Sequence, residues 1–266
     1  IKKLTKLNPG KVLLKPVLEK ANISTLRVAI CGGGPLASSV FKGYNSMGIN
    51  FIQGYGLTET SPIITLNPIE KFKIESVGRS FTPYSEIKIL NPDENGIGEI
   101  CAKGPMIMKG YYNMPEETAK MFTEDGWLKT GDIGKIDKEH YVYLCGRAKN
   151  LIVTAGGKNV YPEEIEDAFQ LCDDVQQIVV QGYANAEDET AEEIEALIYP
   201  SDSVYEELGQ KREESYNSPE VTARIQGEVS KINKTLQPYA RITRITILEN
   251  PLEMTTTKKI KRNYKK

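Results

Sequence analysis

The chain has 266 residues, of which 39% are hydrophobic and 26% charged, a composition typical of a globular protein with one or two domains. A formal net charge of −2 excludes the overall basic character expected of a nucleic-acid-binding protein. The four cysteines form no CxxC pair, which argues against a zinc or redox motif and favours small core side chains in a reducing compartment. No apolar run approaches a membrane span and no signal segment is visible, so we expect a cytoplasmic location.

The first part of the chain alternates between strand and helix patterns. Residues 27–31 form an apolar run that predicts a buried strand, and a glycine triplet follows it. From Pro35 onward, apolar residues at helical spacing predict a helix. Residues 50–53 predict a second strand that runs into a glycine-rich loop at 54–62. This order predicts an α/β architecture, while the glycines match neither the dinucleotide fingerprint GxGxxG nor a GxxxxGKS or GxxxxGKT phosphate loop.

The middle of the chain has a different pattern. From Val77 to Leu144, short alternating strands separated by turns predict a small barrel or a distorted sheet. A short helix is predicted at Pro115–Phe122, where acidic residues occupy the first turn. A boundary is predicted near Gly146.

After this boundary the pattern predicts a compact α+β domain. Strands are predicted at 175–181, 194–199 and 242–248. Helices are predicted from 162 onward and at 219–236. The acidic segment 187–193 predicts a solvated loop between the first two of these strands.

The glycine-rich loop at 54–62 combines residues suited to a nucleotide. Gly54 and Gly56 let a backbone approach a ligand closely, and the hydroxyl of Thr58 suits phosphate oxygens. Glu59 offers a hard carboxylate that can hold Mg²⁺, and Tyr55 offers a flat face for a base. Taken alone, these residues fit an ordinary glycine-rich turn equally well.

The loop also resembles, at residues 55–60, a signature of the adenylate-forming superfamily, which includes acyl-CoA synthetases, luciferases and adenylation domains of peptide synthetases. Four further segments resemble family motifs in the expected order, at 32–36, 127–132, 146–149 with 162–166, and 255–262. Five motifs in order are strong evidence where any one would be weak. The resemblance implies that 1–146 is the C-terminal part of the large AMP-binding domain and that 147–266 is the small mobile C-terminal domain.

The resemblance implies a two-step reaction. A carboxylate attacks the α-phosphate of ATP to give an acyl-adenylate and pyrophosphate, and a thiol, usually that of CoA, then takes the acyl group as a thioester. The implied partners are a small-molecule carboxylate, ATP or AMP, Mg²⁺ and CoA. No nucleic acid partner is implied, and peripheral contact with a membrane stays open.

Several roles follow from the resemblance for residues around the nucleotide. Gly33, Gly34 and Pro35 would line the adenine edge, and Tyr55 with Gly56 would lie against the base. Three other residues would bind the phosphate, the metal and the ribose. Thr58 would bond the α-phosphate, Glu59 would hold Mg²⁺, and Asp132 would accept hydrogen bonds from both ribose hydroxyls.

Further roles fall on the cations of the second half. Arg147 would reach the ribose or phosphate side with its fork of donors. Lys149 matches the hinge about which the small domain of relatives rotates, and Gly157 would face the pantetheine tunnel. Lys259 matches the adenylation lysine, which would bridge the attacking carboxylate and the α-phosphate.

Two departures from the family pattern shape the expectation for this chain. The phosphate-gripping loop that lies upstream in relatives is missing, and residue 1 falls in mid-domain, so we expect a C-terminal fragment that is inactive alone. Lys258 replaces the glycine usual before the catalytic lysine. This version of the motif, together with residues 155–162, is similar to long-chain fatty acid–CoA ligases.

Three alternatives stay open. The acid or the thiol acceptor could differ, as in ligases for an aryl acid or a carrier-protein thiol. A non-enzymatic nucleotide-binding module would share the fold. Nucleic acid binding rests only on six basic residues after Glu253. His140, the sole histidine, lies in a polar turn, and we do not expect it to be catalytic.

Overall fold

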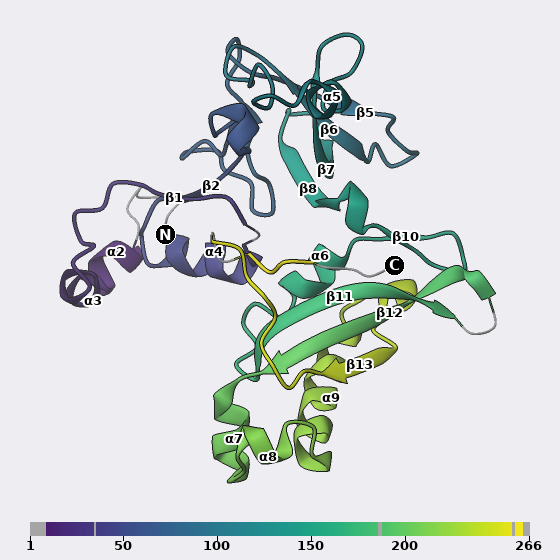
Figure 1. The fold of residues 1–266 in the computed structure, drawn as a ribbon. Coiled ribbons are helices and arrows are strands. Elements are labelled where there is room, and N and C mark those ends of the chain that lie inside the picture. The colour runs from purple at the N-terminus through teal and green to yellow at the C-terminus, as the bar shows by residue number, and fades with distance from the viewer. Residues whose placement is uncertain (1–8, 35, 186–187, 257–258, 263–266) are drawn as a thin grey trace. The chain divides into compact units, whose positions relative to one another are not determined.

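The computed structural model describes residues 9–34, 36–185, 188–256 and 259–262 (Figure 1). The chain divides into two compact units, Ile1–Ala148 and Lys149–Lys266. Compactness alone does not define a domain, so the boundary predicted near Gly146 stays a prediction. Among the described residues, no helix combines the length and apolar character needed to cross a membrane.

The first unit opens with the expected alternation of strands and helices. Its elements are α2 (Pro9–Leu13), α3 (Lys15–Lys20), β1 (Ala29–Cys31), α4 (Ser38–Ser46), β2 (Phe51–Tyr55), β3 (Thr65–Leu66) and β4 (Arg79–Ser80). Strands β1 and β2 pair in parallel, with Ala29 opposite Phe51, and α4 provides the crossover that a parallel pair requires. Phe41 of α4 is fully buried and packs edge-on against Phe51. The α/β prediction for this part is confirmed.

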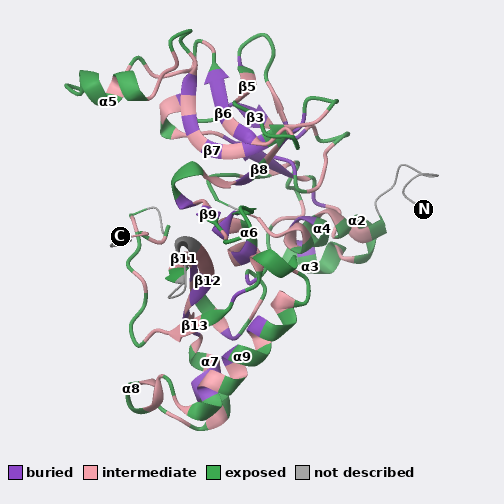
Figure 2. Cartoon of the chain, turned by 90° about the vertical axis from the view of Figure 1, so that its right-hand side faces the viewer, coloured by how far each residue is buried: buried purple, intermediate pink, exposed green. Residues whose placement is uncertain are grey.

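A second sheet follows in the first unit. It contains β5 (Glu86–Leu90), β6 (Gly98–Lys103), β7 (Leu128–Ile136) and β8 (Val142–Arg147), in that order and antiparallel, while helix α5 (Pro115–Lys120) lies between β6 and β7 in sequence. Figure 2 shows buried residues along β6 and β7. Among the described residues, β8 makes a bridge to Gly78 instead of pairing with β5. The distorted sheet is therefore confirmed and the small barrel is wrong.

The second unit is an α+β arrangement, as predicted. Its elements are the 3-10 turn η2 (Ala148–Asn150), β9 (Ile152–Val153), β10 (Asn159–Val160), α6 (Pro162–Asp167), β11 (Val175–Asn185), β12 (Asp188–Pro200), α7 (Asp202–Leu208), α8 (Arg212–Ser215), α9 (Pro219–Asn233), η3 (Pro238–Ala240) and β13 (Arg244–Ile247). Strand β12 pairs antiparallel with β11 and parallel with β13. Helix α9 buries Val221, Ile225 and Val229 at helical spacing, and these residues join one core with the sheet.

The described part of the acidic segment, residues 188–193, is not the predicted loop. Strand β12 begins at Asp188, and the ladder with β11 continues through Tyr183 opposite Glu193, whose carboxylate accepts a hydrogen bond from the tyrosine hydroxyl. The prediction failed because the segment has the charged composition of a loop, whereas the ladder between β11 and β12 is made by backbone hydrogen bonds, which do not depend on apolar side chains.

Candidate functional site

The glycine-rich loop leaves β2 at Tyr55 and turns sharply. A side chain at Gly56 would place its Cβ 1.8 Å from the carbonyl oxygen of Pro62, so only glycine fits there. The Leu57 N–H donates to Thr60 Oγ1 at 2.8 Å, and the Thr60 hydroxyl lies 2.8 Å from the Pro62 carbonyl oxygen. These contacts of the Thr60 side chain accompany the backbone hydrogen bonds of a 3-10 turn, η1 (Thr58–Thr60), in which Thr58 is exposed.

A buried cluster ties this loop to the second sheet. The Tyr55 hydroxyl donates to Asp132 Oδ2 at 2.6 Å, and Arg147 Nη1 donates to Asp132 Oδ1 at 2.7 Å. Asp132 on β7 lies directly opposite Arg147 on β8, and the two residues are 8% exposed and half-buried, respectively. Burial, and then the negative charge of Asp132, raise the pKa of Tyr55 well beyond its usual range, so its hydroxyl stays a donor.

Tyr55 itself is only 7% exposed and belongs to the core cluster of the first unit. Its described contact is with Asp132, and little of its ring faces solvent. Stacking of Tyr55 on a base stays a prediction.

Glu59 is held on the other side of the loop. Its Oε1 accepts a hydrogen bond from the Tyr111 hydroxyl at 2.7 Å, and its backbone carbonyl accepts from the Met108 N–H at 2.8 Å. The hydrogen bond between the Tyr111 hydroxyl and the Glu59 carboxylate is the main reason that the pKa of Tyr111 is raised. Within the part of the chain that is described, no group of three or more His, Cys, Asp or Glu side chains could hold a metal. A single oriented carboxylate fits Mg²⁺, which is often held by one or two carboxylates together with phosphate oxygens.

The glycine triplet lies beside the same loop. Ideal Cβ atoms at Gly33 and Gly34 would meet no atom within 4 Å, and Gly33 has a φ of +82°. At Gly32 a Cβ would lie 3.1 Å from the Gly54 carbonyl oxygen, so the ends of β1 and β2 run side by side. Both predicted glycines are exposed, whereas Pro35 lies outside the described residues.

The remaining predicted residues belong to the second unit. Lys149 is exposed in η2. Gly157, at a φ of +66°, is exposed in the turn between β9 and β10, where its N–H donates to the Thr154 carbonyl. Lys259 is exposed, and its N–H donates to Thr255 Oγ1 at 3.1 Å.

Sequence reasoning missed Tyr111. It follows a glycine and another tyrosine follows it, but its partner Glu59 lies 52 positions earlier in the chain. No local spacing connects two residues so far apart, and only the folded backbone brings them together.

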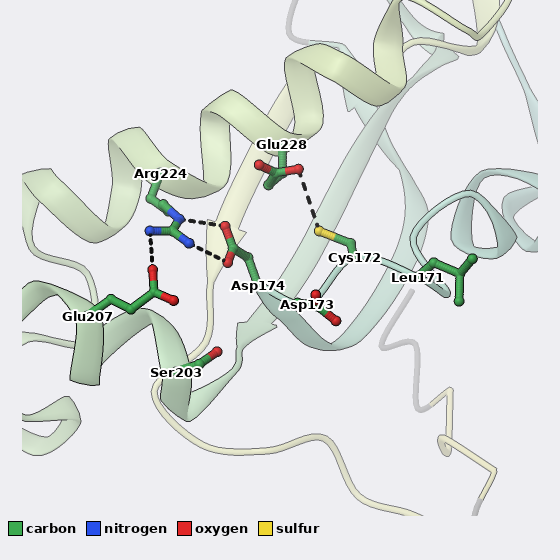
Figure 3. Close-up of a pocket in the computed structure, with 8 residues that line it drawn as sticks. All are labelled: Leu171, Cys172, Asp173, Asp174, Ser203, Glu207, Arg224 and Glu228. Carbon is green, nitrogen blue, oxygen red and sulfur yellow. Dashed lines mark hydrogen bonds and ion pairs between the residues drawn. The ribbon is translucent and has the colours of Figure 1, made fainter. Parts of the chain in front are cut away.

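A hollow of about 700 Å³ in the second unit contains none of the predicted residues (Figure 3). It is lined by Leu171, Cys172, Asp173, Asp174, Ser203, Glu207, Arg224 and Glu228. Arg224 donates to both oxygens of Asp174, at 2.6 and 2.8 Å, and to Glu207 at 2.8 Å. Arg224 therefore pairs with two of the four carboxylates that line the hollow, which gives these three residues a structural role as an ion-pair cluster.

Two family models match this chain. The model described as AMP-binding enzyme matches residues 4–112, and the model described as AMP-binding enzyme C-terminal domain matches residues 149–265.

Individual relatives show the same family. A long-chain-fatty-acid–CoA ligase of Mycobacterium bovis is 32% identical over 249 residues, covering 89% of this chain and 39% of that protein. A 2-succinylbenzoate–CoA ligase of Oceanobacillus iheyensis is 39% identical over 165 residues, covering 60% and 34%. The structure of O-succinylbenzoate coenzyme A synthetase from Bacillus subtilis, in complex with ATP and magnesium ion, has a TM-score of 0.73 at 28% identity, covering 95% of this chain and 49% of that one.

The chain thus spans less than half the length of each of these relatives. Within that span, the match to the AMP-binding enzyme model precedes the match to the AMP-binding enzyme C-terminal domain model, and the similar structure covers nearly all of the chain. The chain therefore belongs to the family of AMP-binding enzymes.

Proposed function

We propose that this chain carries part of the active site of an ATP-dependent acid–CoA ligase that activates a long-chain fatty acid. One observation carries the proposal. The Tyr55–Asp132–Arg147 cluster joins the glycine-rich loop to two motifs on neighbouring strands, of which the Gly-Asp segment lies 77 positions after Tyr55. Such convergence supports a binding site more strongly than any of the motifs alone.

The cluster suits a ribose. An ionised carboxylate has about four acceptor positions, and Asp132 uses one on each oxygen for Tyr55 and Arg147. The remaining positions would accept the two ribose hydroxyls. Because Tyr55 and Arg147 fix both oxygens, the carboxylate would need little reorganisation when a nucleotide binds.

The glycine-rich loop suits the phosphates. The exposed Thr58 hydroxyl would donate to the α-phosphate. Glu59, oriented by Tyr111, would be a ligand of Mg²⁺. Bound there, Mg²⁺ would supply positive charge against the phosphate oxygens, which is the main requirement of this chemistry. Gly33, Gly34 and Pro35 would lie along the adenine edge.

The second unit would supply the mobile parts of the reaction. Lys259 would bridge the attacking carboxylate and the α-phosphate during the first step. Lys149 would be the hinge about which the small domain rotates between the two steps. Gly157 would line the pantetheine tunnel during the second step.

The acid itself is the less constrained part of the proposal. Similarity to the M. bovis long-chain-fatty-acid–CoA ligase supports a fatty acid. Similarity to 2-succinylbenzoate–CoA ligases supports an aryl acid as the second candidate. A panel of substrates separates the two.

The test is carboxylate-dependent exchange between ATP and pyrophosphate. We would use this chain together with any residues that its coding sequence places before Ile1, here called the extended chain. Acids would range from acetate to palmitate and include 2-succinylbenzoate. Lys259→Ala would be compared with Lys261→Ala, a matched control because Lys261 is an exposed lysine on the same segment.

Exchange with long acids that is lost in Lys259→Ala and kept in Lys261→Ala is the expected result. Exchange with 2-succinylbenzoate alone would transfer the assignment to the second candidate. A folded extended chain that binds ATP but exchanges with no acid would refute the ligase proposal. The 266-residue chain alone is expected to show negligible exchange.

A further inference from the structure

One cation near the end of the described chain is largely shielded from solvent. The Arg262 side chain is 13% exposed, whereas its neighbours Lys259 and Lys261 are exposed. Arg262 Nη2 pairs closely with Glu166 Oε2 and lies 3.7 Å from Glu163 Oε1. Its Nη1 donates to the Val180 carbonyl on β11 at 3.3 Å. Burial of one guanidinium in a basic segment points to a specific anchoring role.

The carboxylates that receive Arg262 are themselves fixed. Glu163 and Glu166 project from α6, whose Pro162 and Ile165 are buried. Glu166 Oε1 accepts the Val180 N–H at 2.7 Å. Glu163 Oε1 accepts a hydrogen bond from Asn150, which is buried in η2. One network therefore runs from Asn150 through α6 to Arg262.

The two ends of this network adjoin residues that carry proposed functions. Asn150 follows Lys149, and Arg262 lies three positions after Lys259. Between Glu253 and Arg262 the described backbone folds back on itself. The Thr255 N–H donates to the Lys259 carbonyl at 2.7 Å, and the Lys261 N–H donates to the Glu253 carbonyl at 2.8 Å.

We propose that Arg262 is a positioning residue: its clamp on Glu166 and Glu163 holds the described residues 259–262 against the second unit and so positions Lys259. Lys259 is then held by a fixed backbone, although it lies in a basic terminal segment. The effect of Arg262 on catalysis rests on the proposed function of Lys259, whereas the clamp itself does not.

The network also indicates how a variant without the clamp can stay folded. Burial raises the pKa of Glu166 to about 7, and the attraction of Arg262 opposes this rise. If the guanidinium is removed, Glu166 can take up a proton and need not remain as an unpaired buried charge. Arg262→Met is therefore suitable as a test, since its unbranched side chain can fill much of the same space.

The first experiment measures amide hydrogen exchange in the 266-residue chain and is independent of activity. Arg262→Met is expected to raise the exchange rates of the Thr255 and Lys261 amides at least tenfold and to leave those of β12 within twofold. Lys261→Met, the exposed neighbour, is expected to leave the Thr255 amide within twofold. Unchanged turn amides in Arg262→Met, or a rise that includes β12 equally, would overturn the clamp.

The second experiment separates the two half-reactions in the extended chain. Arg262→Met is expected to lower pyrophosphate exchange at least 100-fold, as Lys259→Ala does, and to change thioester formation from supplied acyl-adenylate less than fivefold. Arg262→Lys keeps the positive charge but loses the forked donors of the guanidinium, so its rate of pyrophosphate exchange is expected to lie between those of the wild type and Arg262→Met. Equal loss of both half-reactions would indicate a purely structural residue and refute the positioning role. If the wild-type extended chain shows no exchange, the proposed function fails, while hydrogen exchange still decides on the clamp.

Discussion

Replacing Tyr55 by phenylalanine removes a single oxygen atom from the centre of the candidate ribose site. The ring stays in its place in the core, because Tyr55 is 7% exposed and phenylalanine fills nearly the same volume. The change deletes the 2.6 Å hydrogen bond to Asp132 Oδ2. Asp132 keeps its contact with Arg147, so no charge is left without a partner.

The expected loss follows from the kind of bond removed. A hydrogen bond to a charged group contributes ~1.5–3 kcal/mol net to stability. Since Asp132 keeps a second partner and phenylalanine removes the buried hydroxyl together with the bond, the loss should lie within this range. We therefore expect the free energy of unfolding of the first unit to fall by ~2 kcal/mol.

The chain provides its own probe for this measurement. It contains a single tryptophan, Trp127, which belongs to the first unit. Urea unfolding followed by tryptophan fluorescence therefore reports on that unit, and the slope of the transition should not change. Tyr112→Phe is the matched control, because Tyr112 is 90% exposed and should change stability by less than ~0.5 kcal/mol. A Tyr55→Phe effect no larger than that of the control would refute the reasoning about the cluster.

Three further predictions use either the 266-residue chain or the extended chain defined above. Gly56→Ala forces a Cβ to within 1.8 Å of a carbonyl oxygen, so the first unit should lose ~2–3 kcal/mol by the same fluorescence assay, and unchanged stability would contradict the loop geometry. Tyr111→Phe removes the hydrogen bond that orients Glu59, so magnesium-dependent ATP binding by the extended chain should weaken ~10-fold in a calorimetric titration, whereas equal affinity would count against Glu59 as a ligand. Asp137 has a pKa of about 2, because desolvation by burial raises it but hydrogen bonds from Lys73 and from backbone N–H groups lower it more. Its folded pKa lies below the unfolded value of ~4, so its stabilisation should be lost as the pH falls from ~4 to ~2. Asp137→Asn should remove this part of the pH dependence, and an identical profile in the variant would refute it.

The sequence predicted those parts of the fold that depend on the spacing of nearby residues. The strand–helix–strand order at the start of the chain follows from apolar spacing and from glycines, and it is confirmed. The family was predicted from five motifs and is confirmed as well. Whether the second sheet closes could not be predicted, because closure depends on which edge β8 meets, and turn spacing contains no information about that.

The residues proposed for the site were named from motifs, whereas their arrangement could not be predicted. Asp132 and Arg147 were each predicted from a motif, whereas their pairing depends on the register between β7 and β8. For Tyr55, only a ring that lies against a base was predicted, and the hydrogen bond from its hydroxyl to Asp132 follows from the fold. Tyr111 and the anchoring contacts of Arg262 had no sequence signal, because their partners lie 52 and 96 positions away.

The anchors on either side of η2 have a consequence for the mechanics of the connecting chain. Arg147 is tied through its side chain to Asp132, and Asn150 is tied through its side chain to Glu163. Between these anchors lie only Ala148 and Lys149, both exposed. The degrees of freedom of the connection are therefore concentrated in the φ and ψ angles of two residues. If Lys149 is the hinge proposed above, a change in its φ and ψ angles would leave both anchors intact.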